Sequence, residues 1–176
     1  MNILLTIILA IALLIALLLL IALFTKNEYN VQREIIIAAP GQKVFDYVKH
    51  IRNQDHYNKW VMADPGMKKE FRGTDGQPGF VYAWNGNKKA GEGEQEIKAI
   101  EEGKKITTEI RFIRPFPGAA HAIMETTPLP GGRTNVKWST GSKLKYPMNI
   151  MIAIIHKMLS KDMGTSLSTL KTILEK

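Results

Sequence analysis

Few residues of this 176-residue chain could carry out metal or acid–base chemistry, and they are scattered. His50, Asp55 and His56 are close in sequence, and imidazole and carboxylate groups are common metal ligands. The two histidines are six residues apart, so one helix face does not present both. No third ligand follows at a typical spacing. We interpret these residues as loop and helix-surface groups, and we predict neither a metal site nor another cofactor.

His121, Glu109 and Glu125 could act as general acids or bases. Each alternates with apolar neighbours at the two-residue period of a β-strand, so its side chain is expected to point to solvent. The chain contains no G-x-S-x-G, H-E-x-x-H or G-x-x-x-x-G-K-[ST] motif. It also contains no cysteine, which excludes disulfides, thiolate metal sites and a cysteine nucleophile. These residues alone do not identify an enzyme.

A second group of side chains has the types that suit an apolar ligand, because large rings and pliable thioethers adapt to flexible molecules. Its members lie at apolar positions of segments with strand or helix periodicity. They are Tyr82, Trp84, Phe112, Met124 and Trp138 in the predicted strands and Met151, Ile155 and Met158 in the predicted C-terminal helix. Plain core packing produces the same pattern, so core and cavity lining remain alternatives for each residue.

Alternating segments predict the strands that position these residues. The alternation is clearest from Lys105 to Phe112, and Gln95, Ile97 and Ala99 are expected to share one face. Turn signals rich in Gly and Pro separate the segments, which favours an antiparallel sheet with one solvated face. The predicted strands are 31–37, 80–84, 95–99, 105–112, 120–125 and 133–138, with 67–72 as a poorer candidate.

Two segments have helical periodicity, Gly41–Arg52 and the long stretch Met148–Glu175. The long helix is the largest available cover for the apolar face of the sheet. Its first part, Met148–Leu159, is more apolar than one buried face requires. We expect the sheet to curl around this part; the alternative is that its second side faces a ligand or a membrane surface. The overall prediction is an α+β fold.

The first 24 residues contain no charge, and Ile3–Phe24 is apolar except for Thr6. As a helix this segment spans roughly 33 Å, which matches a hydrocarbon core of about 30 Å. A cleaved signal peptide is disfavoured, because the run is too long and no cation precedes it; a buried soluble helix is disfavoured by the same length. We predict a membrane anchor (1–25), a linker (26–30) and one domain (31–176). Lys26 and Arg33 follow the anchor, which favours a single-pass protein with a cytoplasmic domain.

Positive charge is concentrated near the C-terminus. Residues 133–176 contain eight Lys or Arg and two acidic residues, within a net charge of +8 for the chain. This skew suits an anionic membrane surface or a solvated face. Nucleic acid is not an expected partner, because no recognition motif is present and the aromatic residues lie at buried positions.

From about residue 29 onward the sequence resembles the START/polyketide cyclase-like superfamily, also called SRPBCC. The resemblance rests on Trp60 and on diffuse segments rather than on a catalytic signature. These segments are VQREIIIAAPGQKVFDYV (31–48), YAWNGNKKAGEGEQEI (82–97), IRFIRPF (110–116) and TNVKWSTGS (134–142). The stretch 53–59 lacks the second Trp that the family often has, and the apolar N-terminal segment lies outside the common domain.

The resemblance implies a helix-grip fold, in which a bent antiparallel sheet encloses an apolar cavity against the C-terminal helix. It also implies an apolar or amphipathic small-molecule ligand, such as a lipid or a polyketide-like compound. Trp60 joins the candidate ligand-binding residues on this ground. The alternatives are a cyclase or dehydratase of the same superfamily and a non-enzymatic interaction module. The sequence identifies no protein partner.

Overall fold

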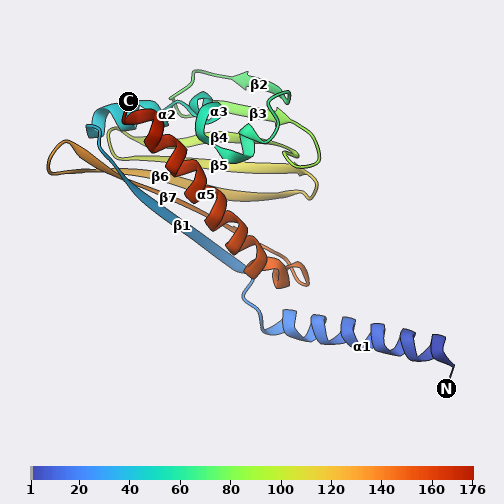
Figure 1. The fold of residues 1–176 in the computed structure, drawn as a ribbon. Coiled ribbons are helices and arrows are strands. Elements are labelled where there is room, and N and C mark those ends of the chain that lie inside the picture. The colour runs from blue at the N-terminus through green and yellow to red at the C-terminus, as the bar shows by residue number, and fades with distance from the viewer. Residues whose placement is uncertain (1) are drawn as a thin grey trace.

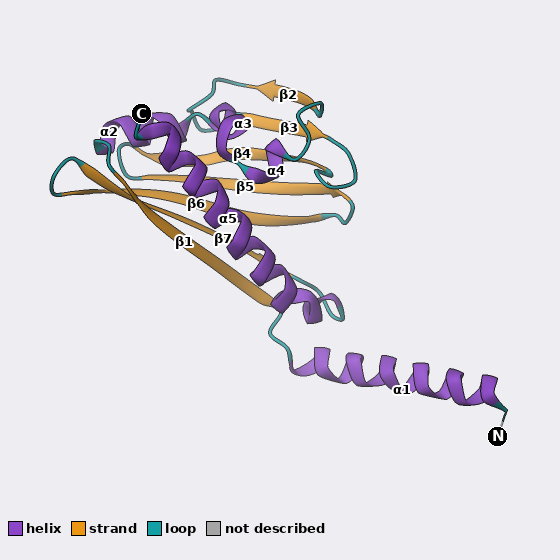
Figure 2. Cartoon of the chain, in the orientation of Figure 1, coloured by secondary structure: helices purple, strands orange, loops and turns teal. Residues whose placement is uncertain are grey.

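The computed structural model describes residues 2–176 and has an α+β helix-grip fold, as the sequence predicts (Figures 1 and 2). A seven-stranded antiparallel sheet packs on one long C-terminal helix, α5 (Ile152–Leu174). The strands are β1 (Glu28–Ile37), β2 (Lys68–Arg72), β3 (Val81–Asn85), β4 (Glu92–Glu101), β5 (Lys105–Arg114), β6 (Gly118–Leu129) and β7 (Arg133–Lys143). The remaining helices are α1 (Ile3–Phe24), α2 (Gly41–Lys49), α3 (Gln54–Tyr57) and α4 (Lys59–Met62), with 3-10 turns η1 (Ile51–Asn53) and η2 (Met148–Met151).

The order of strands in the sheet is β1-β7-β6-β5-β4-β3-β2. The first strand therefore pairs with the last, and the other strands follow as a meander. Alternation places one face of every strand toward α5, and we call this the inner face. Met124 and Trp138 are directly opposite each other on that face of β6 and β7, and Ile106 lies opposite Met124 on β5.

Helix α5 is packed unevenly on the sheet. In its second half the apolar positions are fully covered, as the periodicity predicts, and Arg33 of β1 donates to the carbonyl of Ser160 at 3.3 Å. Toward the N-terminus of α5 the cover is lost, so that Met151 is 37% and Met158 50% exposed. The expectation that the sheet curls around this first part is wrong, because the sheet and helix diverge there. The buried positions of α5 are Ser160, Met163, Ser166, Leu167, Leu170 and Leu174.

The predicted face of β4 is wrong beyond Ile97. The register between β4 and β5 shifts between Ile97 and Ala99, so that Ile100 pairs with Ile106 and joins the core, while Ala99 is exposed. A β-bulge inserts one residue and reverses the alternation after it. Strict alternation within a strand carries no sign of such an insertion.

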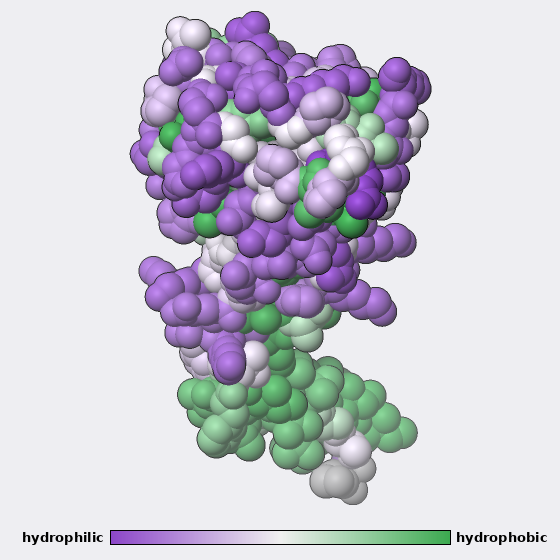
Figure 3. Space-filling view, turned by 90° about the vertical axis from the view of Figure 1, so that its left-hand side faces the viewer, coloured by the Kyte–Doolittle hydropathy of each residue, from purple (hydrophilic) through white to green (hydrophobic). Residues whose placement is uncertain are grey.

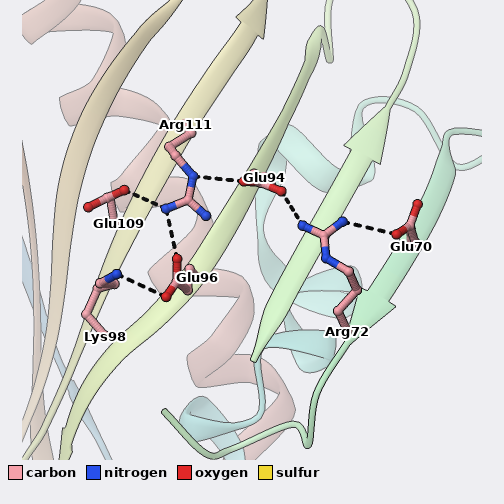
Figure 4. A network of polar contacts seen from close by, with 7 residues as sticks. All are labelled: Glu70, Arg72, Glu94, Glu96, Lys98, Glu109 and Arg111. Atoms are coloured by element: carbon pink, nitrogen blue, oxygen red, sulfur yellow. Dashed lines mark hydrogen bonds and ion pairs between the residues drawn. The ribbon is translucent and has the colours of Figure 1, made fainter. Parts of the chain in front are cut away.

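The outer face of the sheet is charged. Arg111 of β5 contacts Glu94, Glu96 and Glu109, and Arg72 on the edge strand β2 reaches over β3 to Glu94 (Figure 4). The side chain that separates Glu94 from β2 in the register is small, Ala83, which leaves room for this contact. Hydrogen bonds from Arg111 and Arg72 hold the pKa of Glu94 below its ordinary value.

Helix α1 projects away from the domain, and almost all of its side chains are exposed (Figures 1 and 3). Within residues 2–176 it is the one helix that is long and apolar enough to cross a membrane. A short connection, Thr25–Asn27, joins it to β1.

Candidate functional site

Two cavities lie between the sheet and its helices. The inner cavity is small, about 20 Å³, which is room for a single water molecule. Its wall consists of Val48, Ile51, Gln54, Tyr57, Gln95, Ile106, Thr108, Ala122, Met124 and Trp138. None of these described residues is an acid, a lysine or a histidine, so the inner cavity offers no general acid or base of ordinary pKa.

The outer cavity is large, about 1250 Å³, and open to solvent. It lies at the strand ends near α1, and residues from both faces of the sheet line it: Thr140 and Ser142 from the inner face, and His121, Ile123 and Ser139 from the outer face. Phe112, Phe116, Met148, Met151 and Ile155 give it an apolar wall. Polar groups are also present, among them Tyr29, Ser142, Lys145 and Tyr146. Ligand pockets commonly have volumes of roughly 300–1000 Å³ and combine an apolar wall with a few polar groups, so this cavity is large enough for a lipid-sized molecule.

The structure divides the predicted ligand-binding residues between these two places. Phe112, Met151 and Ile155 line the outer cavity, and Met124 and Trp138 line the inner one. Trp60, Tyr82, Trp84 and Met158 line neither. The available space therefore lies farther along the sheet than a cavity centred on the tryptophans would.

The tryptophans themselves are engaged in packing. Trp60 meets Trp138 edge to face with ring centroids 5.8 Å apart, and Trp84 meets Phe112 in the same manner at 6.3 Å. The indole N–H of Trp84 donates to the carbonyl of Ala90 at 3.1 Å. Gly93, opposite Trp84 on β4, leaves room for that ring, because a Cβ there would lie 2.8 Å from it.

Tyr82 belongs to a polar cluster rather than to a cavity. Its hydroxyl donates to Asp55 at 2.7 Å, and Lys69 pairs with the other carboxylate oxygen at 2.7 Å. Burial and the neighbouring carboxylate both raise the pKa of Tyr82, so it stays protonated and acts as a hydrogen-bond donor. This cluster joins α3 to β2 and β3.

The acid–base candidates are on the outer face, as the alternation predicts. Glu109 pairs with Arg111 and Glu125 pairs with Lys137. His121 is exposed on β6, at the margin of the outer cavity. Elsewhere, the ring nitrogen Nδ1 of His50 lies 2.7 Å from the carbonyl of Asp46, while Asp55 belongs to the Tyr82 cluster. Residues 2–176 contain no cluster of three or more His, Cys, Asp or Glu side chains suited to a metal ion.

Three polar residues at these places were not among the predicted ligand-binding residues. Tyr57 is 1% exposed beside the inner cavity, and its hydroxyl has no hydrogen-bond partner within the described chain. Tyr29 lines the outer cavity, and burial raises its pKa although a hydrogen bond with Ser142 opposes the shift. Asn149 is buried between the domain and α1. A single Asn within the apolar run MNIMIAII was the available signal for the last of these.

Comparison with known proteins agrees with this geometry. A sequence profile of the family described as polyketide cyclase / dehydrase and lipid transport matches residues 28–175. The chain therefore belongs to this family and contains an SRPBCC domain. No curated protein matches the sequence at a significant level.

Solved structures share the fold at low sequence identity. Norcoclaurine synthase from Thalictrum flavum aligns with a TM-score of 0.64 and 14% identity over 86% of this chain and 97% of that chain. Protein MLL2253 from Mesorhizobium loti aligns with a TM-score of 0.62 and 17% identity over 84% and 97%. Ara h 8.0201 aligns with a TM-score of 0.61 and 16% identity over 84% and 97%. At such identities the likeness concerns the fold alone.

Proposed function

We propose that this protein is held in a membrane by α1 and binds an apolar or amphipathic small molecule in the outer cavity. The observation that carries the proposal is the open space of about 1250 Å³ between the strand ends and the first half of α5. Phe112, Met151 and Ile155 line it, and these residues are our candidate ligand contacts. The family is one of lipid transport as well as of cyclases and dehydrases, which supports a ligand of this class.

Desolvation would supply the binding energy. Each CH₂ group that leaves water for the cavity contributes roughly 0.8 kcal/mol, against which stands the cost of ordering the ligand and the mobile side chains. Tyr29 and Ser142 would receive a polar head group. Because the pKa of Tyr29 is raised, its hydroxyl remains a donor at neutral pH.

The cavity walls favour binding over catalysis. A cyclase or dehydratase needs an acid–base group that faces its substrate. Glu109 and Glu125 are paired on the outer face, the inner cavity is lined by no acid, lysine or histidine, and Glu28 at the outer cavity is paired with Lys143 at 2.6 Å. We therefore place the enzyme alternative second, with His121 at the cavity margin as the residue to test first.

The experiment compares ligand occupancy of the full chain and of a variant whose cavity is blocked. A Cβ at Gly118, which lines the outer cavity, meets no atom within 4 Å, so Gly118→Trp places a ring in open space. Gly164→Trp is the matched control, because Gly164 also has free space but lies in the part of α5 packed on the sheet. Native mass spectrometry and lipid extraction of the detergent-purified proteins should find bound lipid in the wild type and the control and much less in Gly118→Trp. Equal occupancy in all three, or empty protein throughout, would contradict the proposal and favour an interaction module.

The side of the membrane on which the domain lies is tested separately. We propose the cytoplasmic side, since Lys26 and Arg33 follow α1. The chain has no cysteine, so Lys98→Cys on the outer face of β4 provides a single reactive thiol. A membrane-impermeant maleimide should label it only after the cells are opened. Labelling of intact cells would place the domain outside.

A further inference from the structure

The segment that follows β7 forms hydrogen bonds with the C-terminal end of α1. Asn149 lies in η2, and its side-chain nitrogen Nδ2 donates to the backbone carbonyls of Ala22 and Thr25 at 2.7 and 2.8 Å. Tyr146 approaches the carbonyl of Leu19 at 3.5 Å. Asn149 is 3% exposed, and Ala22 is the one buried residue of α1 as the structure describes it. The domain is therefore docked on the helix end rather than loosely tethered to it.

These contacts satisfy groups that the end of a helix leaves without partners. The last four carbonyls of a helix have no donors within it, and in an apolar medium each such group is costly. The hydroxyl of Thr25 donates to Ile21 at 2.9 Å, and Asn149 serves Ala22 and Thr25. Because the Asn149 side chain donates to two of these backbone carbonyls, the end of α1 can lie at the boundary of a bilayer without leaving them unsatisfied.

The contact between Tyr146 and Leu19 indicates how deeply the segment after β7 would lie in a membrane spanned by α1. Leu19 precedes Phe24, the last residue of α1, by five positions, or about 7 Å along the helix axis. If α1 spans the hydrocarbon core, a segment beside Leu19 lies several ångströms below the surface. Interfacial segments bury their apolar sides to depths of roughly 5–10 Å.

The side chains around this contact are suited to that depth. Tyr146 is 50% exposed and Met148 is also exposed; both line the outer cavity, as does Phe116 (69% exposed) in the β5–β6 turn, and Ile113 (55% exposed) lies near the end of β5. We call these four residues the lip. Tyr is a residue type that concentrates at membrane interfaces. In the space-filling view the surface of α1 is almost entirely apolar, whereas the domain above it is mostly hydrophilic (Figure 3).

Cations flank the lip. Lys26 lies two residues after the end of α1, and Lys145 precedes Tyr146; both side chains are exposed. The backbone N–H of Leu144 donates to the carbonyl of Asn27 at 2.8 Å, which holds the two lysine-bearing segments together. Long cationic side chains beside apolar surface extend toward anionic headgroups while their stems remain in apolar surroundings.

We propose that the lip is inserted in the bilayer interface beside α1, so that the outer cavity opens onto lipid and takes its ligand, an amphipathic lipid with an acyl chain, directly from the membrane. This inference rests on the proposed function and adds the source and the entry route of the ligand. The partner surface is the bilayer that contains α1.

The experiment measures the depth of single labelled positions in the full chain, which has no native cysteine. Cysteine replaces Met148 or Phe116 in the lip, Lys98 on the outer face as the exposed control, and Leu9 in α1 as the inserted control. Each variant carries a nitrobenzoxadiazole label in phosphatidylcholine–phosphatidylglycerol vesicles that contain doxyl-labelled lipid. We expect strong quenching at positions 9, 116 and 148 and little at 98. Lip labels that behave like position 98 while position 9 is quenched would overturn the inserted lip and leave the anchor intact.

A second measurement tests entry. In the variant Ile113→Asp, whose side chain belongs to the lip but does not line the outer cavity, uptake of a pyrene-labelled phosphatidylcholine from vesicles should slow several-fold, while binding of the same lipid in detergent remains at the wild-type level. Unchanged uptake would contradict entry through the lip. Loss of binding in wild-type protein in detergent would instead contradict the proposed function itself, so the two failures are distinguishable.

Discussion

The indole rings of Trp60 and Trp138 meet edge to face at 5.8 Å, and of the two only Trp138 lines the inner cavity. Along β7 the inner-face positions pass from Val136 in the core through Trp138 at the inner cavity to Thr140 and Ser142 at the outer one. Under the proposed function, Trp138 would therefore limit how far a ligand in the outer cavity extends into the domain.

We predict that Trp138→Phe lengthens the accessible cavity. The smaller ring should lower the free energy of unfolding by about 1–2 kcal/mol, because it leaves part of the indole volume empty. Lipid extracted from this variant should carry longer acyl chains than lipid from the wild type. Trp84→Phe is the control, since Trp84 lines neither cavity. Identical chain-length profiles for Trp138→Phe and the wild type would show that Trp138 does not limit depth.

The Tyr57 hydroxyl provides a contrast with that of Tyr82. Tyr57 is fully buried without a partner in the described chain, whereas Tyr82 donates to Asp55 at 2.7 Å. Tyr57→Phe should change the free energy of unfolding by less than about 0.5 kcal/mol or increase it, because no hydrogen bond is lost. Tyr82→Phe should lower it by about 1–3 kcal/mol, since an ionised acceptor loses its donor. Urea unfolding measures both, and a large loss for Tyr57→Phe would show that its hydroxyl is bonded to a water in the inner cavity.

Periodicity predicted the elements well because it reflects which side of each strand or helix is apolar. The alternation from Lys105 to Phe112 and the helical spacing of Met163, Leu167 and Leu170 are both found in the structure. The position of the open cavity was not predictable in this way. An apolar side chain that packs in a core and one that lines a cavity have the same spacing, and only the divergence of α5 from the sheet separates Met151 from Met163.

Two other features depend on geometry that periodicity does not contain. The bulge at Ile97–Ala99 is an insertion in one strand relative to its partner, so the sequence of β4 alone does not reveal it. The role of Asn149 depends on α1, which is 124 or more residues away in the chain at each of its hydrogen bonds. The family resemblance supplied the fold but said nothing of a segment that lies outside the common domain.

Gly93 is predicted to be the glycine least tolerant of a side chain among the strand positions near Trp84. A Cβ there would lie 2.5 Å from the carbonyl oxygen of Arg111 and 2.8 Å from the Trp84 ring. Gly93→Ala should lower the free energy of unfolding by about 1–3 kcal/mol, because strand or ring must move. Gly118→Ala, with open space around its Cβ, is the matched control and should be near neutral. Chemical unfolding that gives equal stabilities would show that the sheet accommodates the methyl group at no cost.

Acid should weaken the charged outer face. The pKa of Glu94 is lowered by hydrogen bonds from Arg111 and Arg72, so its contribution to stability is complete above its ordinary pKa of 4.5 and is lost as pH falls through the lower folded value. Glu94→Gln should therefore flatten the decline of the melting temperature below about pH 4.5. Glu102→Gln, whose carboxylate is 64% exposed, is the control. If the melting temperature of Glu94→Gln falls with pH as steeply as that of the wild type, the acid sensitivity arises from other carboxylates.

Asn149→Ala is predicted to release the domain from α1 without unfolding it. Both hydrogen bonds of its amide go to Ala22 and Thr25, so the sheet and α5 lose no partner. The melting temperature of the domain should stay close to that of the wild type, as it should for the control Asn135→Ala, whose amide bonds only Glu34 on the outer face. In vesicles, a protease should cleave the Thr25–Asn27 connection faster in Asn149→Ala than in either reference. A label at position 148 should lose its lipid quenching while one at position 9 keeps it, because the anchor no longer holds η2 at depth. Cleavage and quenching at wild-type levels would mean that the apolar lip alone keeps the domain on the bilayer and that the Asn149 contacts are dispensable.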